Sequence, residues 1–311
     1  MGDIQADAES AQHSKGGIKV FTLKIENDSG LYELTHNPQY HVISVQGLTR
    51  PANDINTSPG SADGAYFNSS RMQPRNIVIT LVLAGDIEAS RQLLYSIFPV
   101  HKPMLVYFQN NRRNVKITGY VETLEGDLFV QQEEIQISII CPNPYWQDVN
   151  PASIQLVQTA NSLKFPLSIN EGEPIPFSEA TSSPAAKVTI NGDVESGFIF
   201  TGTVVSSYAG PMAPLTSLTL TNITTGDTMP INYGMRNGDI ITINTLPGQL
   251  NVSAFLLEQQ QTVNLIQYML RNAKWIRLAP GDNVLSLRYT TLGYNTTVEA
   301  SIEAYSLYGG V

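Results

Sequence analysis

The chain has 311 residues, 42% of them hydrophobic, which is enough to bury the cores of two ordinary domains. Only 14% of the residues are charged, against about 25% in a typical globular protein, so uncharged polar side chains cover much of the surface. The formal net charge is −9: residues 1–145 carry 11 Lys/Arg and 15 Asp/Glu, and residues 146–311 carry 7 and 12. Because neither half is basic, the main driving force for general nucleic-acid binding is missing.

The single cysteine, Cys141, excludes an intrachain disulfide and a zinc site built from thiolates. Residues 1–17 are polar and acidic, without the apolar segment of a secretory signal, and are predicted to form a flexible leader. No apolar run approaches the roughly 20 residues that span a bilayer. We therefore expect a protein that is made in the cytoplasm and does not insert into a membrane.

Hydrophobic alternation and turn residues predict a β-rich first half with a single helix. Asp86 is positioned to cap that helix, its apolar residues fall on one stripe, and Pro99 ends it. The other segments alternate as strands do. In chain order the predicted elements are strands at 20–25 and 41–45, a strand at 76–83, the helix at 86–98, a hairpin of 104–108 with 114–121, and a strand at 135–140.

The polar segment 47–74 is unusually long for a loop inside a compact domain. Asp63-Gly64, near its middle, suits a hairpin turn. We expect an extended arm that contacts a neighbouring subunit, because Tyr66, Phe67 and Met72 give it apolar surface to bury. A disordered insertion is the alternative interpretation.

A boundary between two domains is predicted near residue 147. Pro142 and Pro144 stiffen the chain there and are incompatible with a helix or a central strand. Tyr145 and Trp146 follow at once and are expected to anchor this linker to a domain surface. The predicted parts are therefore the leader 1–17, an N-terminal domain 18–147 that carries the arm, and a C-terminal domain 148–311.

The second half consists of short apolar runs separated by turn residues, which favours a β-sandwich. Apolar residues at helical spacing predict one helix near 262–271, and Trp275-Ile276-Arg277-Leu278 alternates as a strand does. The predicted strands are 154–157, 187–190, 198–205, 217–221, 228–231, 240–244, 284–289 and 298–305.

Catalytic and metal-binding patterns are missing from the sequence, so we expect no enzyme activity, no cofactor and no metal. None of the common hydrolase, metalloprotease or nucleotide-binding motifs occurs. Cys141 is expected to be a buried, inert thiol. The acidic residues near 122–134 are expected to form a solvated edge, since no pair of carboxylates stands out as a glycosidase site. The histidines are expected to be solvated loop residues: His13, His36, His41 and His101.

Two further features have both a structural and a functional interpretation. Arg112 and Arg113 form the only adjacent basic pair and lie at a predicted hairpin tip, where they suit either a solvated turn or an intersubunit salt bridge. Trp275, with Tyr289 and Tyr294 nearby in sequence, suits either core packing or a sugar-stacking platform. Core packing is favoured for Trp275 because its neighbours alternate.

The order of several motifs resembles the distal tail proteins (Dit type) of long-tailed, non-contractile bacteriophages. Lys116 to Val121 resembles the family pattern R-x-I-x-G-x-V through Ile117, Gly119 and Val121, with Lys116, directly before the isoleucine, in place of the Arg, and Cys141 to Trp146 resembles C-x-x-P-[FY]-W. In the second half, Ile240 to Thr245 resembles I-x-I-D-T with Asn244 in place of Asp, and Leu278 to Asn283 resembles L-x-P-G-x-N. The order Asp63-Gly64, Arg75, the strand 76–83 and the helix 86–98 also follows the family, over roughly residues 18–311.

The resemblance implies a mainly β fold in two parts. The N-terminal domain would be a β-sandwich with one α-helix and a protruding hairpin, and the C-terminal domain a galectin-like β-sandwich of jelly-roll type. Six N-terminal domains would close into a ring at the distal end of the tail, in the virion. This structural hub would join the tail-tube protein to the tail-tip protein, and often to receptor-binding proteins, and phage DNA would cross its lumen.

Three other functions compete with the hub. A carbohydrate-binding adhesin would use Trp275 or the tyrosines near 289–294 on host wall polysaccharide. The galectin sugar chemistry is not expected, because the second half contains no histidine. A tail-tube subunit would stack into open tubes, and a glycan hydrolase lacks its carboxylate pair.

Overall fold

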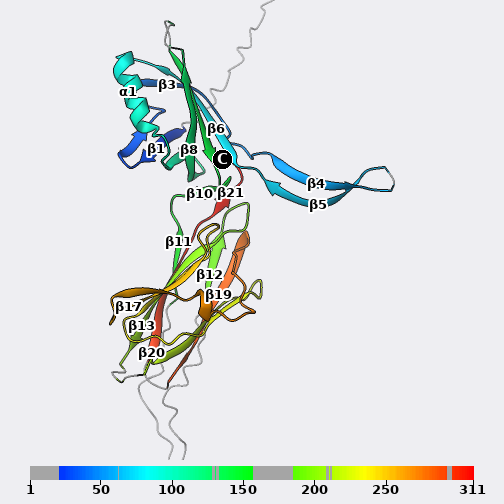
Figure 1. The fold of residues 1–311 in the computed structure, drawn as a ribbon, viewed down its shortest axis with the longest axis vertical. Coiled ribbons are helices and arrows are strands. Elements are labelled where there is room, and N and C mark those ends of the chain that lie inside the picture. Colours follow the sequence, from blue (N-terminus) through cyan, green and yellow to red (C-terminus); the bar gives the residue numbers. More distant parts are fainter. Residues whose placement is uncertain are drawn as a thin grey trace, which may run out of the picture.

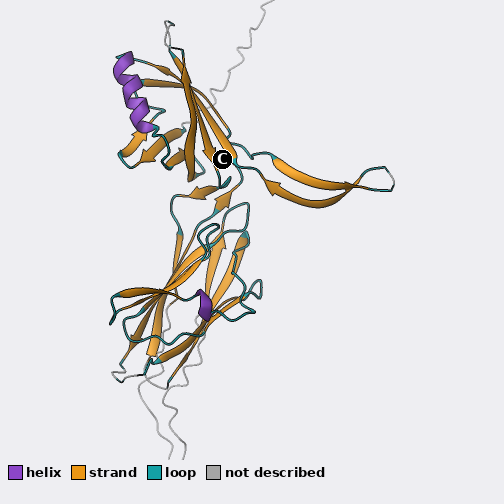
Figure 2. Ribbon diagram, in the orientation of Figure 1, coloured by secondary structure: helices purple, strands orange, loops and turns teal. Residues whose placement is uncertain are grey.

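The computed structural model describes residues 21–61, 63–127, 130, 133–156, 185–207, 210, 212–292 and 296–311. These residues form two β-rich domains and a long hairpin that leaves the first domain (Figures 1 and 2). The predicted leader 1–17 lies outside the described residues. Within the described part no helix is long and apolar enough to cross a bilayer.

The first domain is a sheet whose strands follow the order β2-β1-β7-β8-β9-β6-β3. Its two ends enclose one core that includes β1 and β7 from one half and β6 and β9 from the other, as in a sandwich. Short strands β10 and β21 extend the sheet beside β8. The strands are β1 (Thr22–Asn27), β2 (Gly30–Glu33), β3 (Tyr40–Gln46), β6 (Arg75–Leu83), β7 (Met104–Gln109), β8 (Asn114–Gly126), β9 (Glu134–Cys141), β10 (Trp146–Asp148) and β21 (Leu307–Tyr308).

The long strand β8 joins the two halves of this sheet, because it pairs with β7 up to Gly119 and with β9 from Tyr120 onward. Gly119 lies where the strand changes partner. A Cβ atom on Gly119 would lie 2.5 Å from Cγ2 of Ile139 and 3.0 Å from Sγ of Cys141. The close approach of β8 to β9 therefore explains the glycine of the motif at 116–121.

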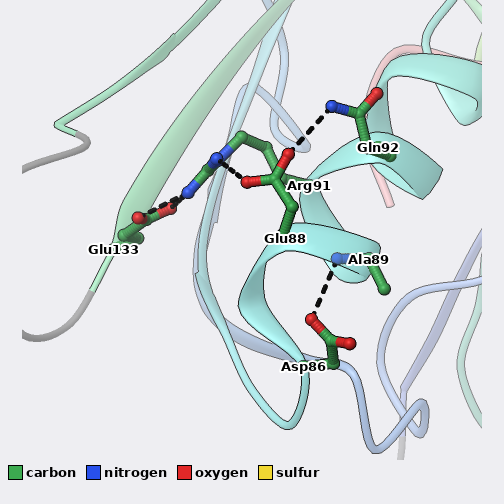
Figure 3. Close-up of polar contacts among 6 residues, drawn as sticks. All are labelled: Asp86, Glu88, Ala89, Arg91, Gln92 and Glu133. Atoms are coloured by element: carbon green, nitrogen blue, oxygen red, sulfur yellow. Dashed lines mark hydrogen bonds and ion pairs between the residues drawn. The ribbon is translucent and has the colours of Figure 1, made fainter.

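Helix α1 (Ile87–Ile97) covers the first domain and buries Leu94 and Ile97 in its core. The side chain of Asp86 accepts a hydrogen bond of 3.2 Å from the backbone N–H of Ala89 and caps the helix (Figure 3). Arg91 reaches from the helix to the carboxylate of Glu133 at 2.6 Å and also contacts Glu88 (Figure 3). The expectation that Glu133 belongs to a solvated edge is wrong, because Glu133 is 8% exposed and paired with Arg91.

The second domain is a sandwich of two antiparallel sheets around a separate core. Alternate residues of its central strands are buried, so each strand presents one face to that core. One sheet contains, in order, β11 (Ala152–Leu156), β20 (Thr296–Ala304), β13 (Phe198–Ser206), β16 (Ile240–Asn244), β17 (Asn251–Leu256) and β18 (Gln261–Asn264). The other contains β12 (Ala185–Ile190), β19 (Gly281–Thr291), β14 (Leu215–Asn222) and β15 (Thr228–Ile231). The predicted mainly β class, with one α-helix in the N-terminal domain, is confirmed.

Two local predictions in this domain are wrong. The predicted helix at 262–271 is instead strand β18 followed by the short 3₁₀ helix η1 (Ile266–Tyr268). Tertiary hydrogen bonds decide this outcome: the backbone N–H of Leu265 bonds to the carbonyl of Val252, and that of Leu270 to the carbonyl of Pro230. The segment 275–278 is not a strand either, although Ile276 and Leu278 are buried as the alternation predicts.

The two family-like motifs of the second half close turns. Asn283 is fully buried; its side chain accepts from the backbone N–H of Ala279 at 3.1 Å and donates to its carbonyl at 2.7 Å. Asn244, at the position where the family often has Asp, accepts a hydrogen bond from the backbone N–H of Leu246 at 2.9 Å. An asparagine oxygen serves this turn as well as a carboxylate does.

Removal of the helix cap gives a first test of the fold. Asp86→Ala should lower the free energy of unfolding by about 1 kcal/mol, because the N–H of Ala89 loses its acceptor. Asp86→Asn keeps an acceptor and should lose less. Urea unfolding followed by circular dichroism measures both variants, and equal losses would contradict a capping role for this side chain.

Candidate functional site: the arm and its anchor

The predicted arm 47–74 contains strands β4 (Asn53–Pro59) and β5 (Ala65–Met72), which form a two-stranded sheet of their own. The hairpin projects from the first domain into solvent (Figure 1). Just before β5, Gly64 takes a φ of +105°, which favours glycine. An isolated two-stranded hairpin is only marginally stable in water, so the arm gains stability from any partner that covers it.

The two faces of the arm differ in polarity. Residues that pair across the strands share a face, which places Ile55, Phe67 and Met72 together on one side. Ile55 is 63% and Phe67 65% exposed. The opposite face carries an ion pair of 3.4 Å between Arg71 and Asp54. The arm is therefore amphipathic, with an uncovered apolar face.

The arm residues predicted from the sequence divide between these faces. Phe67 lies on the apolar face, whereas Tyr66, which is equally exposed, pairs with Ser58 on the polar face. Met72 is half-buried where the hairpin meets the domain. The residue missing from the prediction is Ile55, whose partner across the strands is Ser70.

The arm is anchored by Arg75, the first residue of β6, which is 1% exposed. Its guanidinium donates to four backbone carbonyls. Two of these, Gly47 and Thr49, lie where the chain enters the arm. The third is Pro144 in the linker, at 2.8 Å, and the fourth is Gly309 near the C-terminus, at 2.6 Å. Arg75 thus joins segments that lie up to 234 residues apart.

The Arg75 charge is held without a carboxylate among its hydrogen-bond acceptors. Burial lowers the pKa of Arg75, while Cys141 opposes this shift, and an arginine stays protonated in proteins. Carbonyl dipoles supply the favourable interactions that water would otherwise provide. The guanidinium also lies 5.5 Å from the ring centroid of Trp146. Lysine cannot replace it, because three donors on one nitrogen cannot reach four separated carbonyls.

Gly47 makes the sharp turn into the arm possible. Its φ is +79°, and a Cβ atom there would lie 1.9 Å from the carbonyl oxygen of Asn76. Any other residue would collide with the backbone of β6. The arm therefore leaves the domain at a fixed place.

The linker residues predicted as an anchor lie beside Arg75. Trp146 is fully buried in the first core and its ring packs against Phe108 with centroids 6.3 Å apart, which is deeper than the expected surface contact. Pro144 provides the carbonyl that Arg75 binds. Tyr145 is half-buried, and Pro142 is exposed.

Arg112 and Arg113, predicted as a pair, have different environments. Arg112 is exposed at the β7–β8 turn. Arg113 is engaged within the chain: it donates to the carbonyl of Gly310 and lies 4.2 Å from the ring centroid of Tyr308. Asp193 of the second domain is 3.8 Å from both Arg113 and Arg50. These contacts join the β7–β8 turn to the C-terminus and to the second domain.

Trp275 is half-buried and packs against the second core, in agreement with the core interpretation. Tyr289 also packs against that core, and Tyr294 lies outside the described residues. No group of three or more potential metal-ligating residues occurs in the part of the chain that the structure describes.

Three residues with central contacts at this site were not predicted from the sequence: Arg75, Asp193 and Tyr308. Arg75 appeared only as the residue before an apolar strand. Its one sequence signal is a charged residue immediately before such a strand, close to a glycine that opens a polar segment and to the Pro-rich linker.

Arg75→Met tests the anchor, because it removes the donor from one buried and three part-buried hydrogen bonds to backbone carbonyls. We expect it to lower the free energy of unfolding of the first domain by at least about 3 kcal/mol, since an unsatisfied buried acceptor costs roughly 1–3 kcal/mol. Arg75→Lys should lie between this variant and the original protein. Arg112→Ala, at an exposed position, is the control and should change stability by less than about 0.5 kcal/mol. A change for Arg75→Met as small as for the control would contradict the anchor.

Cys141 gives a second test of burial at this site. Burial raises the pKa of Cys141 to about 12, and the charge of Arg75 opposes that shift. The reactive thiolate is therefore scarce at pH 8. A thiol reagent should leave the folded protein unmodified at this pH and label one thiol per chain in urea. Rapid labelling of the folded protein would contradict a closed core beside Arg75.

Neither a family model nor a curated protein sequence matches the chain. Among solved structures, the fold is similar to the crystal structure of Dit (gp 19.1) of phage SPP1, presented as a paradigm of the hub adsorption apparatus in phages that infect Gram-positive bacteria. The TM-score is 0.62 at 13% identity, over 93% of this chain and 99% of the phage protein. A chain of the phage P2 baseplate in its activated conformation with Ca gives a TM-score of 0.49 at 13% identity, over 92% of this chain and 98% of that chain. The form with Sr gives 0.47 at 12%, over 91% and 98%.

The likeness to the SPP1 protein extends over both domains and nearly the full length of each chain. At 13% identity it establishes a common fold. The resemblance to the Dit-type distal tail proteins, predicted from the order of short motifs, is confirmed at the level of fold.

Proposed function

We propose that this protein is a structural hub at the distal end of a bacteriophage tail. Six copies form a closed ring through their N-terminal domains. The ring joins the tail-tube protein above it to the tail-tip protein below it, and receptor-binding proteins attach to the assembly. The protein is made in the host cytoplasm, works in the virion and has no catalytic activity of its own.

The amphipathic arm is the observation that carries this proposal. A hairpin that exposes Ile55 and Phe67 at more than 60% presents an apolar surface well away from its own domain. Covering such a surface stabilises an assembly by roughly 25 cal/mol for each Å² removed from water. In a closed ring each arm is covered by the next copy, so no apolar face is left to promote open-ended aggregation.

The fold and the charge distribution support the remaining parts of the proposal. The common fold with the SPP1 Dit protein, itself described as a hub, supports the position at the tail end. An acidic chain without a basic stripe suits a lumen through which DNA slides without binding. The second domain, a two-sheet sandwich, suits a galectin-like module on the outside of the ring. The adhesin alternative gains no support from Trp275, which is packed against the core.

Replacing the exposed aromatic residues of the arm one at a time tests the ring and identifies its docking face. Phe67→Ser removes the largest side chain of the apolar face, and the loss of a buried interface aromatic typically costs about 2–4 kcal/mol per contact. We expect the ring to dissociate at concentrations where the original protein has six times the chain mass of 34.0 kDa, as measured by light scattering.

Tyr66→Ser is the matched comparison, since Tyr66 is just as exposed but lies on the polar face. It should weaken the ring less than Phe67→Ser does. A larger effect of Tyr66→Ser would assign docking to the polar face. An unmodified protein that forms open-ended tubes, or that stays monomeric at the highest concentrations, would contradict the proposed hub.

A further inference from the structure

We propose that residues 307–311 act as a latch that fixes the arm, so that the arm is held in place only after the second domain has folded. The consequence for ring formation rests on the proposed function. The latch itself is a property of the single chain and can be tested on the monomer, whether or not rings form.

The latch completes the first domain although it follows the second domain in the sequence. Leu307 and Tyr308 form strand β21, which pairs with Gln147 and Trp146 of β10. Tyr308 belongs to the first hydrophobic core and is 6% exposed. Its hydroxyl donates to the carboxylate of Asp148 at 3.1 Å. The first domain is therefore incomplete until residues 307 and 308 are in place.

The latch contacts the base of the arm directly. The carbonyl of Gly309 is one of the four acceptors of Arg75, which also binds the carbonyls of Gly47 and Thr49. The backbone N–H of Val311 donates to the carbonyl of Leu48 at 3.2 Å. A Cβ atom on Gly310 would lie 3.4 Å from the backbone of Thr49, so the two segments run close together. In Figure 1 the C-terminus lies where the arm leaves the domain.

The second domain holds the other side of the latch. The backbone N–H of Asp193 donates to the carbonyl of Leu307 at 2.8 Å, and its carboxylate accepts from the N–H of Gly309 at 3.3 Å. Gly192 lies so close to Leu307 that a Cβ atom there would be 2.4 Å from the carbonyl oxygen of Leu307. The latch is thus clamped between the linker strand β10 and the segment 192–194 of the second domain.

These contacts couple the arm to the state of the second domain. Loss of the latch removes one acceptor of Arg75 and the hydrogen bond to Leu48 together, and it uncovers the backbone of Thr49 beside Gly310. Arg75 then keeps only its bonds to Gly47, Thr49 and Pro144, so the base of the arm opens more readily. Because residues 307–311 follow the second domain in the sequence, they are synthesised after it, and a chain that lacks them has no fixed arm to offer to a neighbour.

Amide hydrogen exchange read by mass spectrometry tests the latch, on the full chain at a dilution where it is monomeric. Two variants weaken the latch: a chain that ends at Ser306, and the milder Arg113→Ala, which removes the bond to Gly310 and the contact with Tyr308. In both variants, peptides covering residues 47–53 and 72–76 should exchange about tenfold faster or more. Arg113→Ala loses the charge-assisted hydrogen bond to Gly310, and the shortened chain loses Gly309, an acceptor of Arg75. Peptides of the second domain core should be unchanged.

Arg236→Ala, the same substitution at an ion pair with Glu258 in the second domain, is the control and should leave the base of the arm unaffected. Unchanged exchange at the base of the arm in Arg113→Ala would overturn the latch, whether or not rings form. Faster exchange there, with ring mass by light scattering unaltered, would uphold the latch and instead contradict the role of the arm in assembly.

Discussion

A single buried guanidinium organises the molecule. Arg75 lies inside the protein without a carboxylate among its hydrogen-bond acceptors, and a charge in that position is tolerable only when several dipoles point at it. The four carbonyls that satisfy it come from the entrance to the arm, the linker and the C-terminus. None of these segments can move away alone without leaving part of the charge unsatisfied. This constraint fixes the base of the arm relative to the linker and the C-terminal residues.

The arm depends on that anchor because it has little stability of its own. Its two strands pair only with each other among the described residues, and its apolar face is uncovered. A flexible base would let the hairpin sample many directions, and ordering it on binding would cost conformational entropy. A base held by Arg75, by Gly47 and by the C-terminal residues removes most of that cost before a neighbour arrives. The low charge content suits the same purpose, because backbone pairing and apolar contacts need few ions.

Local secondary structure could be predicted from the sequence, whereas contacts between residues far apart in the chain could not. The helix with its Asp86 cap, the strand 76–83 and the arm follow from periodicity and turn chemistry, which act over a few residues. The apolar residues of the segment 262–271 have helical spacing and so predict a helix, but the same residues also suit a strand followed by a turn. Backbone hydrogen bonds from this segment to β15 and β17 favour the strand and the turn. Strand β17 was missed for the same reason, since its pairing with β16 and β18 sets it more than its own pattern does.

The candidate site illustrates the same limit. Tyr66, Phe67 and Met72 were identifiable as apolar residues in a polar segment, but the bulge after residue 67 decides which of them share a face. Arg113 was expected to contact solvent or a neighbouring subunit, and it contacts the C-terminus of its own chain instead. The role of Arg75 could not be predicted, because its acceptors lie as far apart as Gly47 and Gly309 and carry no side chain that marks them.

Electron cryo-microscopy of the assembled protein tests the account most directly. The account predicts closed rings of six copies in which the face bearing Ile55 and Phe67 is covered by the next copy. Arg75 should lie among the same four carbonyls in every subunit. Open-ended stacks, or rings whose arms extend free into solvent with that face uncovered, would contradict it.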